Sequence, residues 1–203
     1  MVLGEREEVL YGKGYIVDKL CGLTFKISPK SFYQVNHDQT ELLYRKAIEF
    51  MGLTGKEKVI DAYCGTGTIG LVASHDAKEV LGVELNSQAI KDARYNAKEN
   101  KVSNITFVCE DATDFMLSYA RGGTRADVVV MDPPRSGSTK EFIAALKSLS
   151  PRRVVYVSCN PETLARDIKL LKKAGFKAEK CVPVDMFPWT DEVECVVQLS
   201  KDK

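Results

Sequence analysis

Short apolar runs alternate with amphipathic stretches along most of the chain. Seven runs rich in apolar and β-branched residues fit strands, at residues 58–62, 79–83, 105–108, 126–131, 153–157, 176–184 and 192–199. The first five are nearly all apolar, which is typical of strands buried on both faces of a parallel sheet. The last two are joined by a loop that contains Pro188, which predicts an antiparallel pair that closes the sheet.

The segments between these strands carry the apolar spacing of helices. They span residues 88–99, 140–149 and 162–174, and Gly175 follows the last of them, as is typical of a helix end. A further amphipathic segment, residues 38–51, precedes the first strand. The pattern predicts an α/β fold with a seven-stranded, mostly parallel sheet, one antiparallel strand, and helices on both faces.

Before this core, residues 14–17 and 23–27 form two short strand-like runs, and no repeat, low-complexity tract or clear linker separates them from it. A chain of 203 residues is long enough for one well-buried core. We therefore expect residues 1–52 to be an N-terminal extension packed on the core, and residues 53–203 to be the main domain.

The composition is that of an ordinary soluble globular protein, with 44% hydrophobic and 28% charged residues. No apolar run approaches the roughly 20 residues that cross a bilayer, and residues 1–13 lack the apolar centre of a signal peptide. We expect a cytoplasmic monomer that binds no membrane. The net charge of +1 lacks the strongly basic footprint of a self-sufficient nucleic-acid-binding domain.

Cysteines are the first candidates for chemistry. They lie far apart and never form the close pairs of a zinc or iron–sulfur site, so we expect reduced thiols, no metal and no iron–sulfur cluster. Taken singly, each cysteine is more often a small buried residue than a reactive group. The six are Cys21, Cys64, Cys109, Cys159, Cys181 and Cys195.

The first strand runs into a glycine-rich turn, with glycines at 65, 67 and 70 between a strand and a helix. Backbone without Cβ atoms allows a ligand to approach closely, although a tight strand–helix turn alone also explains the pattern. The next strand is followed by Glu84, about twenty residues on, whose carboxylate suits the two hydroxyls of a ribose. Together these features favour a nucleoside cofactor.

Two acidic residues discriminate between nucleoside cofactors. Asp61, at the end of the first strand, would repel the pyrophosphate of a dinucleotide but suits the cationic aminoacyl part of S-adenosylmethionine. Asp111, just after the third strand, is placed to meet the adenine amine. It is equally well placed to be the N-cap of a helix that begins at Ala112, and the two roles are compatible.

Ligands of open α/β sheets bind beyond the carboxyl ends of the strands, and three unusual segments fall there. The fourth strand ends in Asp132-Pro-Pro-Arg135, whose prolines fix the backbone and present a carboxylate beside a partnered arginine. The alternative is a proline-rich loop with a surface ion pair. The fifth strand ends in Ser158-Cys-Asn-Pro161, and the last loop leads to Glu194.

Cys159 precedes Asn160 and Pro161, which fit an N-cap and a first helical residue. A thiol at a helix N-terminus has its thiolate favoured by the helix dipole, so we expect a lowered pKa. This position makes Cys159 the cysteine suited to act as a nucleophile; the alternative is a small buried residue under the sheet end.

These residues resemble the uracil-5 RNA methyltransferases that modify bacterial 23S ribosomal RNA and tRNA. The matching segments occur in the family's order over almost the whole chain. They are Phe32-Tyr-Gln-Val-Asn36, Asp61-Ala-Tyr-Cys-Gly-Thr-Gly67, Asp132-Pro-Pro-Arg135, Ser158-Cys-Asn-Pro161, and Asp185-Met-Phe-Pro188 with Glu194. The resemblance implies a Rossmann-like class I methyltransferase fold and S-adenosylmethionine as the cofactor, with S-adenosylhomocysteine as its product.

The resemblance also implies roles for single residues. Cys159 is the nucleophile and Glu194 the general base, and Asp132 or Arg135 orients the base and supports charge on the ring. A larger set belongs to the cofactor site. Its members are Gln34, Asp61, Tyr63, Gly65, Gly67, Thr68, Glu84, Asp111 and Asp132.

Two departures from the family stand out. The chain has Trp189 and Glu192 where members usually have Gln and His, which indicates a different loop around the base. It also lacks the N-terminal RNA-binding β-barrel and the four-cysteine motif of full-length members. We infer a fragment that begins within the family's central region.

We expect 23S ribosomal RNA as the substrate, with tRNA as the alternative. A further alternative is that the chain is a fragment that binds the cofactor but is inactive without its RNA-binding domain. A methyltransferase acting on adenine or protein amides, and a binding domain without catalysis, are rival hypotheses. Arg135 in place of an aromatic residue argues against the first, and the intact Cys159 and Glu194 argue against both.

Overall fold

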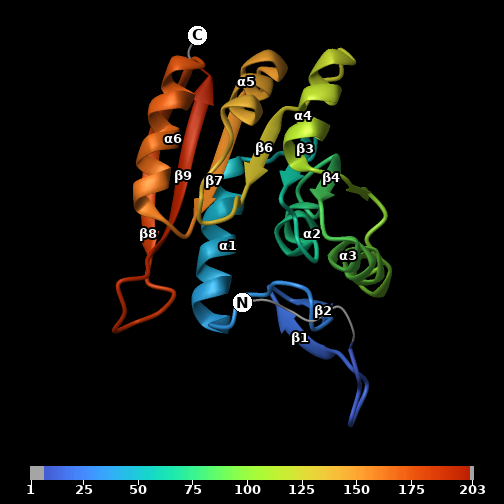
Figure 1. Cartoon of the computed structure of the whole chain (residues 1–203). Helices are drawn as coiled ribbons and strands as arrows, with labels where there is room; N and C mark the ends of the chain where they lie inside the picture. Colours follow the sequence, from blue (N-terminus) through green and yellow to red (C-terminus); the bar gives the residue numbers. More distant parts are fainter. Residues whose placement is uncertain (1–6, 202–203) are drawn as a thin grey trace.

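A seven-stranded sheet forms the centre of the molecule (Figure 1). The computed structural model describes residues 7–201 of the chain. The strands of the sheet lie in the order β5-β4-β3-β6-β7-β9-β8, and within this described sheet β9 alone runs antiparallel to its neighbours. The predicted α/β fold is confirmed. The strands are β3 Lys58–Ala62, β4 Glu79–Glu84, β5 Ile105–Cys109, β6 Val128–Met131, β7 Arg153–Ser158, β8 Phe176–Val184 and β9 Glu194–Lys201.

Helices cover both faces of the sheet (Figure 1), and each face has its own apolar core. One core holds side chains of α1, α2 and α3, and the other those of α4, α5 and α6. Strand β6 shows why its sequence is all apolar: Val128 and Val130 enter the first core, Val129 and Met131 the second. The helices are α1 His37–Met51, α2 Thr68–Ala73, α3 Ser87–Glu99, α4 Ala112–Arg121, α5 Lys140–Leu149 and α6 Pro161–Lys173.

The predicted helix ends agree with the structure. The side-chain oxygen of Asn160 accepts hydrogen bonds from the backbone N–H groups of Glu162 (2.9 Å) and Thr163 (3.3 Å), with Pro161 in the first turn of α6. Gly175 follows the helix with φ +86°, which is the left-handed conformation that favours glycine after a helix end.

The chain before α1 forms a hairpin of β1 Ile16–Leu20 and β2 Leu23–Ile27. The first strand, predicted at residues 14–17, instead spans Ile16–Leu20, because Gly14 has φ +70°, which a strand residue does not adopt. The last strand was predicted two residues too early, since Glu192 and Val193 lie in the loop before β9.

The hairpin binds α3 through polar side chains rather than through another strand. Backbone N–H groups of Thr24, Lys26 and Ser28 donate to side-chain oxygens of Asn100 (2.8 Å), Asn96 (2.7 Å) and Asp92 (2.9 Å) respectively. Four residues of helix rise about 6 Å and two residues of strand about 6.7 Å. Side chains four residues apart on α3 therefore stay level with backbone groups two residues apart on β2. This ladder holds the hairpin against the core.

Helices that cross membranes need a long apolar stretch. None of the helices described within residues 7–201 is long and apolar enough to cross one.

Candidate active site

A pocket of about 520 Å³ opens at the carboxyl ends of the parallel strands, which point downward in Figure 1. This is the edge where ligands of open α/β sheets bind, beside the point where the strand order reverses between β3 and β6. We call it the first pocket. Its lining comprises Phe32, Gln34, Tyr63, Gly65, Glu84, Leu85, Asp111, Ala112, Asp132, Pro133, Pro134, Arg135, Cys159 and Glu194.

The glycines of the turn after β3 have different reasons to be glycine. Gly65 lines the pocket with φ +53°, and a Cβ there would meet nothing within 4 Å, so this backbone is open to a ligand. Gly67 does not line the pocket; with φ +82°, its Cβ would lie 2.9 Å from the ring of Phe107. Tyr63 also has a positive φ, +65°, a strained conformation of the kind that concentrates at functional sites.

Asp61 lies beneath this turn, fully buried, and does not line the pocket. The backbone N–H of Gly70 donates to its Oδ2 (2.7 Å), whereas its Oδ1 has no hydrogen-bond partner among the described residues. Burial raises the pKa of Asp61 to about 7, against the Gly70 hydrogen bond, and Glu84 raises it further. Thr68 is also outside the lining; its hydroxyl bonds the Tyr44 hydroxyl at 2.9 Å.

Two other acidic residues do face the first pocket. Glu84 accepts the backbone N–H groups of Gly65 (3.1 Å) and Asn86 (2.7 Å), one on each oxygen, which fixes its carboxylate. Asp111 is the N-cap of α4, where its Oδ1 accepts from the backbone of Thr113 (2.8 Å). Each carboxylate retains acceptor capacity for a ligand.

The charges around the first pocket suit a cationic ligand. Burial raises the pKa of Asp132 well above its usual value, and Glu194 and Asp61 raise it further. Carboxylates this close repel each other, so a positive charge bound among them is favoured. The residues that line the pocket therefore fit S-adenosylmethionine: Asp132 and Glu194 suit its ammonium and sulfonium, and Glu84 and Asp111 suit its ribose and adenine.

A second pocket, of about 430 Å³, adjoins the first. Both are lined by Cys159 and Glu194, together with Arg135, Gln34 and Phe32. The loop that leads into β9 supplies the rest of the second pocket. These added residues are Phe187, Thr190, Glu192 and Val193.

Cys159 follows β7 and precedes the N-cap of α6, as the sequence predicted. The prediction that its thiol pKa is lowered was wrong. Burial raises the pKa of Cys159, and the carboxylates of Glu194 and Asp132 raise it further, while Arg135 and a backbone hydrogen bond lower it. The helix end alone does not decide the charge of this sulfur, because two acidic groups face it.

Glu194 is the first residue of β9 and only 5% exposed. Its Oε2 has no hydrogen-bond partner among the described residues. Burial raises the pKa of Glu194; Arg135 lowers it and Glu192 raises it. A buried carboxylate with a free oxygen and a raised pKa is a competent proton acceptor next to Cys159.

Arg135 spans the mouth of both pockets and forms an ion pair with Glu192, whose Oε2 lies 2.8 Å from Nη2. The backbone carbonyl of Arg135 accepts from the side chains of Asn160 (3.3 Å) and Thr163 (3.1 Å). The loop after β6 is thus tied to the start of α6, which places Arg135 beside Cys159.

A buried residue that sequence reasoning missed reinforces this tie. Asp167 of α6 is fully buried and accepts hydrogen bonds from the backbone N–H of Ser138 (2.7 Å) and the hydroxyl of Tyr156 (2.8 Å). Arg166 forms an ion pair with its other oxygen at 2.8 Å. Asp167 therefore joins β7, α6 and the loop after β6 behind the site.

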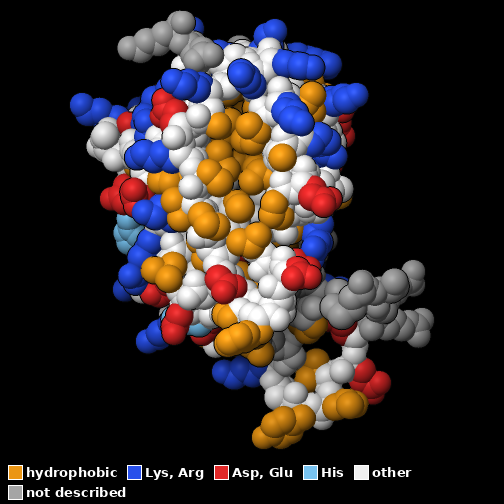
Figure 2. All heavy atoms as spheres, turned by 90° about the vertical axis from the view of Figure 1, so that its left-hand side faces the viewer, with side chains coloured by type: hydrophobic (Ala, Val, Ile, Leu, Met, Phe, Trp, Pro, Cys, Tyr) orange, Lys and Arg blue, Asp and Glu red, His pale blue; other side chains and the backbone are white. Residues whose placement is uncertain are grey.

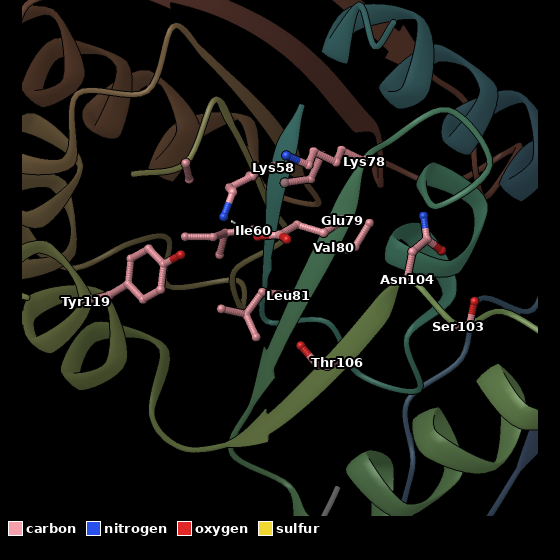
Figure 3. Close-up of a pocket in the computed structure, with 12 residues that line it drawn as sticks. Lys58, Ile60, Lys78, Glu79, Val80, Leu81, Ser103, Asn104, Thr106 and Tyr119 are labelled. Carbon is pink, nitrogen blue, oxygen red and sulfur yellow. Dashed lines mark ion pairs between the residues drawn. The ribbon is translucent and has the colours of Figure 1, made fainter. Parts of the chain in front are cut away.

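Figure 3 shows a different hollow, of about 390 Å³, lined by residues of β3, β4 and β5 and by Tyr119. An ion pair between Lys58 and Glu79 (2.7 Å) crosses it. None of the predicted site residues lines this hollow, so it lies apart from the candidate active site.

The sequence matches the model of the tRNA (uracil-5-)-methyltransferase family over residues 6–202. It is 48% identical over 200 residues to an uncharacterized RNA methyltransferase of Oceanobacillus iheyensis, a match that covers 98% of this chain and 44% of that protein. An uncharacterized RNA methyltransferase of Caldanaerobacter subterraneus is 49% identical over 201 residues, covering 99% and 44%. The chain spans less than half the length of these relatives.

A solved structure with the same fold is Pyrococcus abyssi tRNA (uracil-54, C5)-methyltransferase in complex with S-adenosyl-L-homocysteine. It superimposes with a TM-score of 0.79 and 35% sequence identity, over 93% of this chain and 45% of that one. More distant structures, among them a tRNA m1G37 methyltransferase of M. jannaschii at 18% identity and TM-score 0.74, share the fold alone.

Proposed function

The chain belongs to the tRNA (uracil-5-)-methyltransferase family, and on that premise we propose that it is the catalytic part of an enzyme that methylates carbon 5 of a uridine in RNA. One observation carries the proposal: the two adjoining pockets share Cys159 and Glu194. A cofactor in the first pocket and a uracil in the second would meet at these two side chains.

The first pocket is proposed to hold S-adenosylmethionine, which supplies an electrophilic methyl group when bound. Glu84 would accept from the ribose hydroxyls, Asp111 from the adenine amine, and Asp132 would hold the cationic end. Gln34, Tyr63 and the open backbone at Gly65 complete the wall. Asp61, Gly67 and Thr68 would act from beneath, by holding the turn after β3 in place.

The second pocket is proposed to hold the target uracil. Carbon 5 of uracil is a weak nucleophile, so the Cys159 thiolate first forms a bond to carbon 6 and pushes electron density onto carbon 5. Carbon 5 would then take up the cofactor's methyl group, whose bond to the sulfonium sulfur breaks and leaves S-adenosylhomocysteine. Arg135, whose guanidinium is at the pocket mouth, would stabilise the negative charge that develops on the ring.

Glu194 completes the cycle. Its carboxylate removes the proton from carbon 5, the double bond between carbons 5 and 6 re-forms, and the bond from carbon 6 to the Cys159 sulfur breaks. The thiolate is thereby regenerated. The free Oε2 of Glu194 and its raised pKa support this role. Asp132, which interacts electrostatically with both Glu194 and Cys159, would orient the base.

The target must leave its base stack to enter such a pocket, so the substrate is a flipped or single-stranded uridine. We propose 23S ribosomal RNA or, as the alternative, tRNA as the substrate. The tRNA alternative is favoured by the name of the matched family and by the tRNA substrate of the Pyrococcus abyssi relative. To decide between them, transcripts of both RNAs are incubated with the protein and cofactor in parallel, and the methylated fragment is identified by its mass.

The mechanism is tested with RNA in which 5-fluorouridine replaces uridine. Fluorine at carbon 5 cannot be removed as a proton, so the bond between carbon 6 and the Cys159 sulfur persists after methyl transfer and traps the RNA on the protein. At high RNA concentration and with S-adenosylmethionine present, we expect a covalent adduct visible by denaturing electrophoresis and mass spectrometry.

Two cysteine variants distinguish the nucleophile from the other thiols. Cys159→Ala should form no adduct, whereas Cys181→Ala, an exposed thiol on β8, should form it at the unchanged rate. An adduct that persists in Cys159→Ala would overturn the assignment of the nucleophile.

A further inference from the structure

The loop between β8 and β9 carries a fully exposed tryptophan at the edge of the second pocket. Trp189 is 104% exposed, the largest exposed fraction among the large apolar side chains of the described residues. Its neighbours Phe187 and Thr190 line the second pocket. Exposure of so large an apolar surface is unfavourable in water, so we expect a binding partner to cover the indole of Trp189.

The backbone at Trp189 is also strained. The backbone N–H of Thr190 donates to the carbonyl of Phe187 (3.1 Å), which defines a tight turn with Pro188 and Trp189 at its centre. Trp189 has φ +72°, at the turn position that favours glycine or asparagine when proline precedes it. A bulky residue in this conformation is an outlier that costs about 1 kcal/mol or more, and such outliers concentrate at functional sites.

The base of the loop is fixed, although its tip is exposed. Met186 is fully buried in the core shared with α1, and its carbonyl accepts from the side chain of Asn36 (2.9 Å). Thr40 contacts the Met186 sulfur at 3.8 Å. The Thr190 hydroxyl donates back to the Phe187 carbonyl (2.7 Å). The indole of Trp189 is therefore presented by a well-anchored turn.

The surroundings of Trp189 indicate which part of a nucleic acid contacts it. Asp185, Asp191 and Glu192 lie on the same loop, and Glu192 already holds Arg135. An acidic loop repels phosphates, so backbone contacts are disfavoured here. A neutral aromatic face remains, and every base offers a π-face on which it can stack.

We propose that Trp189 is a stacking platform for an unpaired base next to the target uridine in the RNA strand. The inference rests on the proposed function, since the second pocket has to hold the uridine for its neighbour to reach the loop. Phe187 and Thr190 line both the second pocket and a hollow of about 510 Å³ on the other side of the loop. A strand that leaves the second pocket along these residues would pass the turn that carries the indole.

The tryptophan provides its own readout, because it is the chain's only one. Fluorescence of the full chain is recorded while a short single-stranded oligoribonucleotide, one uridine flanked by purines, is added. Stacking on a base should quench the indole emission. The same strand annealed to its complement should quench it far less, since its bases are already stacked.

Affinity is measured in parallel by the anisotropy of end-labelled RNA. Trp189→Ala should weaken binding of the single strand about five- to tenfold, in line with the loss of one base stacked on an aromatic side chain. Trp189→Phe, which keeps a ring, should bind within about twofold of the unchanged chain. Tyr95→Ala, which removes a half-exposed ring on α3, should bind unchanged.

Two further arms keep the outcomes separate. Trp189→Gly removes the ring and relieves the backbone strain, so it should unfold at a higher temperature while binding RNA as weakly as Trp189→Ala; this shows that lost affinity is not lost folding. Adduct formation at Cys159 is scored independently: quenching without an adduct refutes the proposed function but not the stacking. Unchanged emission, or equal affinity of Trp189→Ala and the unchanged chain, refutes the stacking.

Discussion

At the scale of single residues, opposing charges set the chemistry of the site. Arg135 lowers the pKa of both Cys159 and Glu194, whereas Glu192 raises that of Glu194 and at the same time pairs with Arg135. The pKa values of both side chains therefore depend on the exposed ion pair between Arg135 and Glu192. Glu192, where relatives were expected to have His, is part of this balance.

The ion pair predicts opposite shifts in the pH dependence of adduct formation. In the proposed mechanism, adduct formation with 5-fluorouridine needs the Cys159 thiolate but no proton removal by Glu194, so its rate should rise with pH. Arg135→Gln removes a charge that lowers the pKa of Cys159 and should move the profile to higher pH; Glu192→Gln removes the negative charge that pairs with Arg135 and should move it to lower pH. We expect shifts of roughly half to one pH unit, since the pair is exposed.

The measurement is the rate of adduct formation with 5-fluorouridine RNA between pH 6 and 9. Glu141→Gln, an exposed acid on α5, serves as the control with an unchanged profile. Shifts of both variants in the same direction would contradict this account.

The sequence singled out most of the polar residues that line the first pocket, although Asp61, Gly67 and Thr68 lie outside it, and it did not predict their charge states. Cys159 was expected to have a lowered thiol pKa from its place before α6 alone. Its surroundings come from three strand ends, β6, β7 and β9, which bring Asp132 and Glu194 close to it. Such long-range terms are absent from any local pattern, whereas a motif such as the N-cap at Asn160 is local and was predicted correctly.

At the scale of elements, buried polar side chains on helices hold the loops of the site. In α6, Leu164, Asp167 and Leu171 follow the spacing of a buried helix face, and all three are buried. An acid at such a position is the sequence signal that identifies Asp167 in hindsight. Asp92 and Asn96 of α3 carry the same signal for the hairpin.

Removing the hydrogen bonds of Asp167 should disorder the loops of the site before it unfolds the whole chain. Asp167→Asn loses the ion pair with Arg166 and changes the acceptor of Tyr156, so we expect stability to fall by about 1–3 kcal/mol in urea unfolding. Adduct formation should slow as the loop with Arg135 becomes less ordered. Tyr156→Phe, which removes one hydrogen bond only, should cost about 1 kcal/mol. Equal losses in the two variants would contradict a central role for Asp167.

Two elements with regular periodicity, β3 Lys58–Ala62 and α5 Lys140–Leu149, were predicted to the residue, and helices α1, α3 and α6 to within one residue at each end. Both have clear boundaries: β3 ends at the glycine-rich turn, and α5 begins after the N-cap Thr139. The wall formed by Phe187, Thr190 and Val193 was not predicted, because an irregular loop has no periodic signal and its path depends on where Met186 packs.

At the scale of the whole molecule, the site and the basic surface are separated. The pockets open at the carboxyl ends of the strands, at the lower end in Figure 1. On the side seen in Figure 2, Lys and Arg side chains are most crowded at the upper end, with others down the left edge. Within the described residues, Arg135 is the one cation that lines either pocket, and Glu192 neutralises it. The linings of the two pockets therefore offer little positive charge to hold RNA phosphates.

This separation predicts that the chain binds S-adenosylmethionine but methylates RNA inefficiently. Calorimetry should detect cofactor binding with about one ligand per chain, since the first pocket is complete. On ribosomal RNA transcripts, we expect kcat/KM roughly a hundredfold or more below that of a relative of twice the length, because several phosphate contacts are worth orders of magnitude in affinity. The loss should lie mostly in a higher KM. Higher salt should raise the KM of this chain less than it raises the KM of the longer relative, because the longer relative has more phosphate contacts to lose. Equal kcat/KM for the two proteins would show that these pockets recruit RNA unaided.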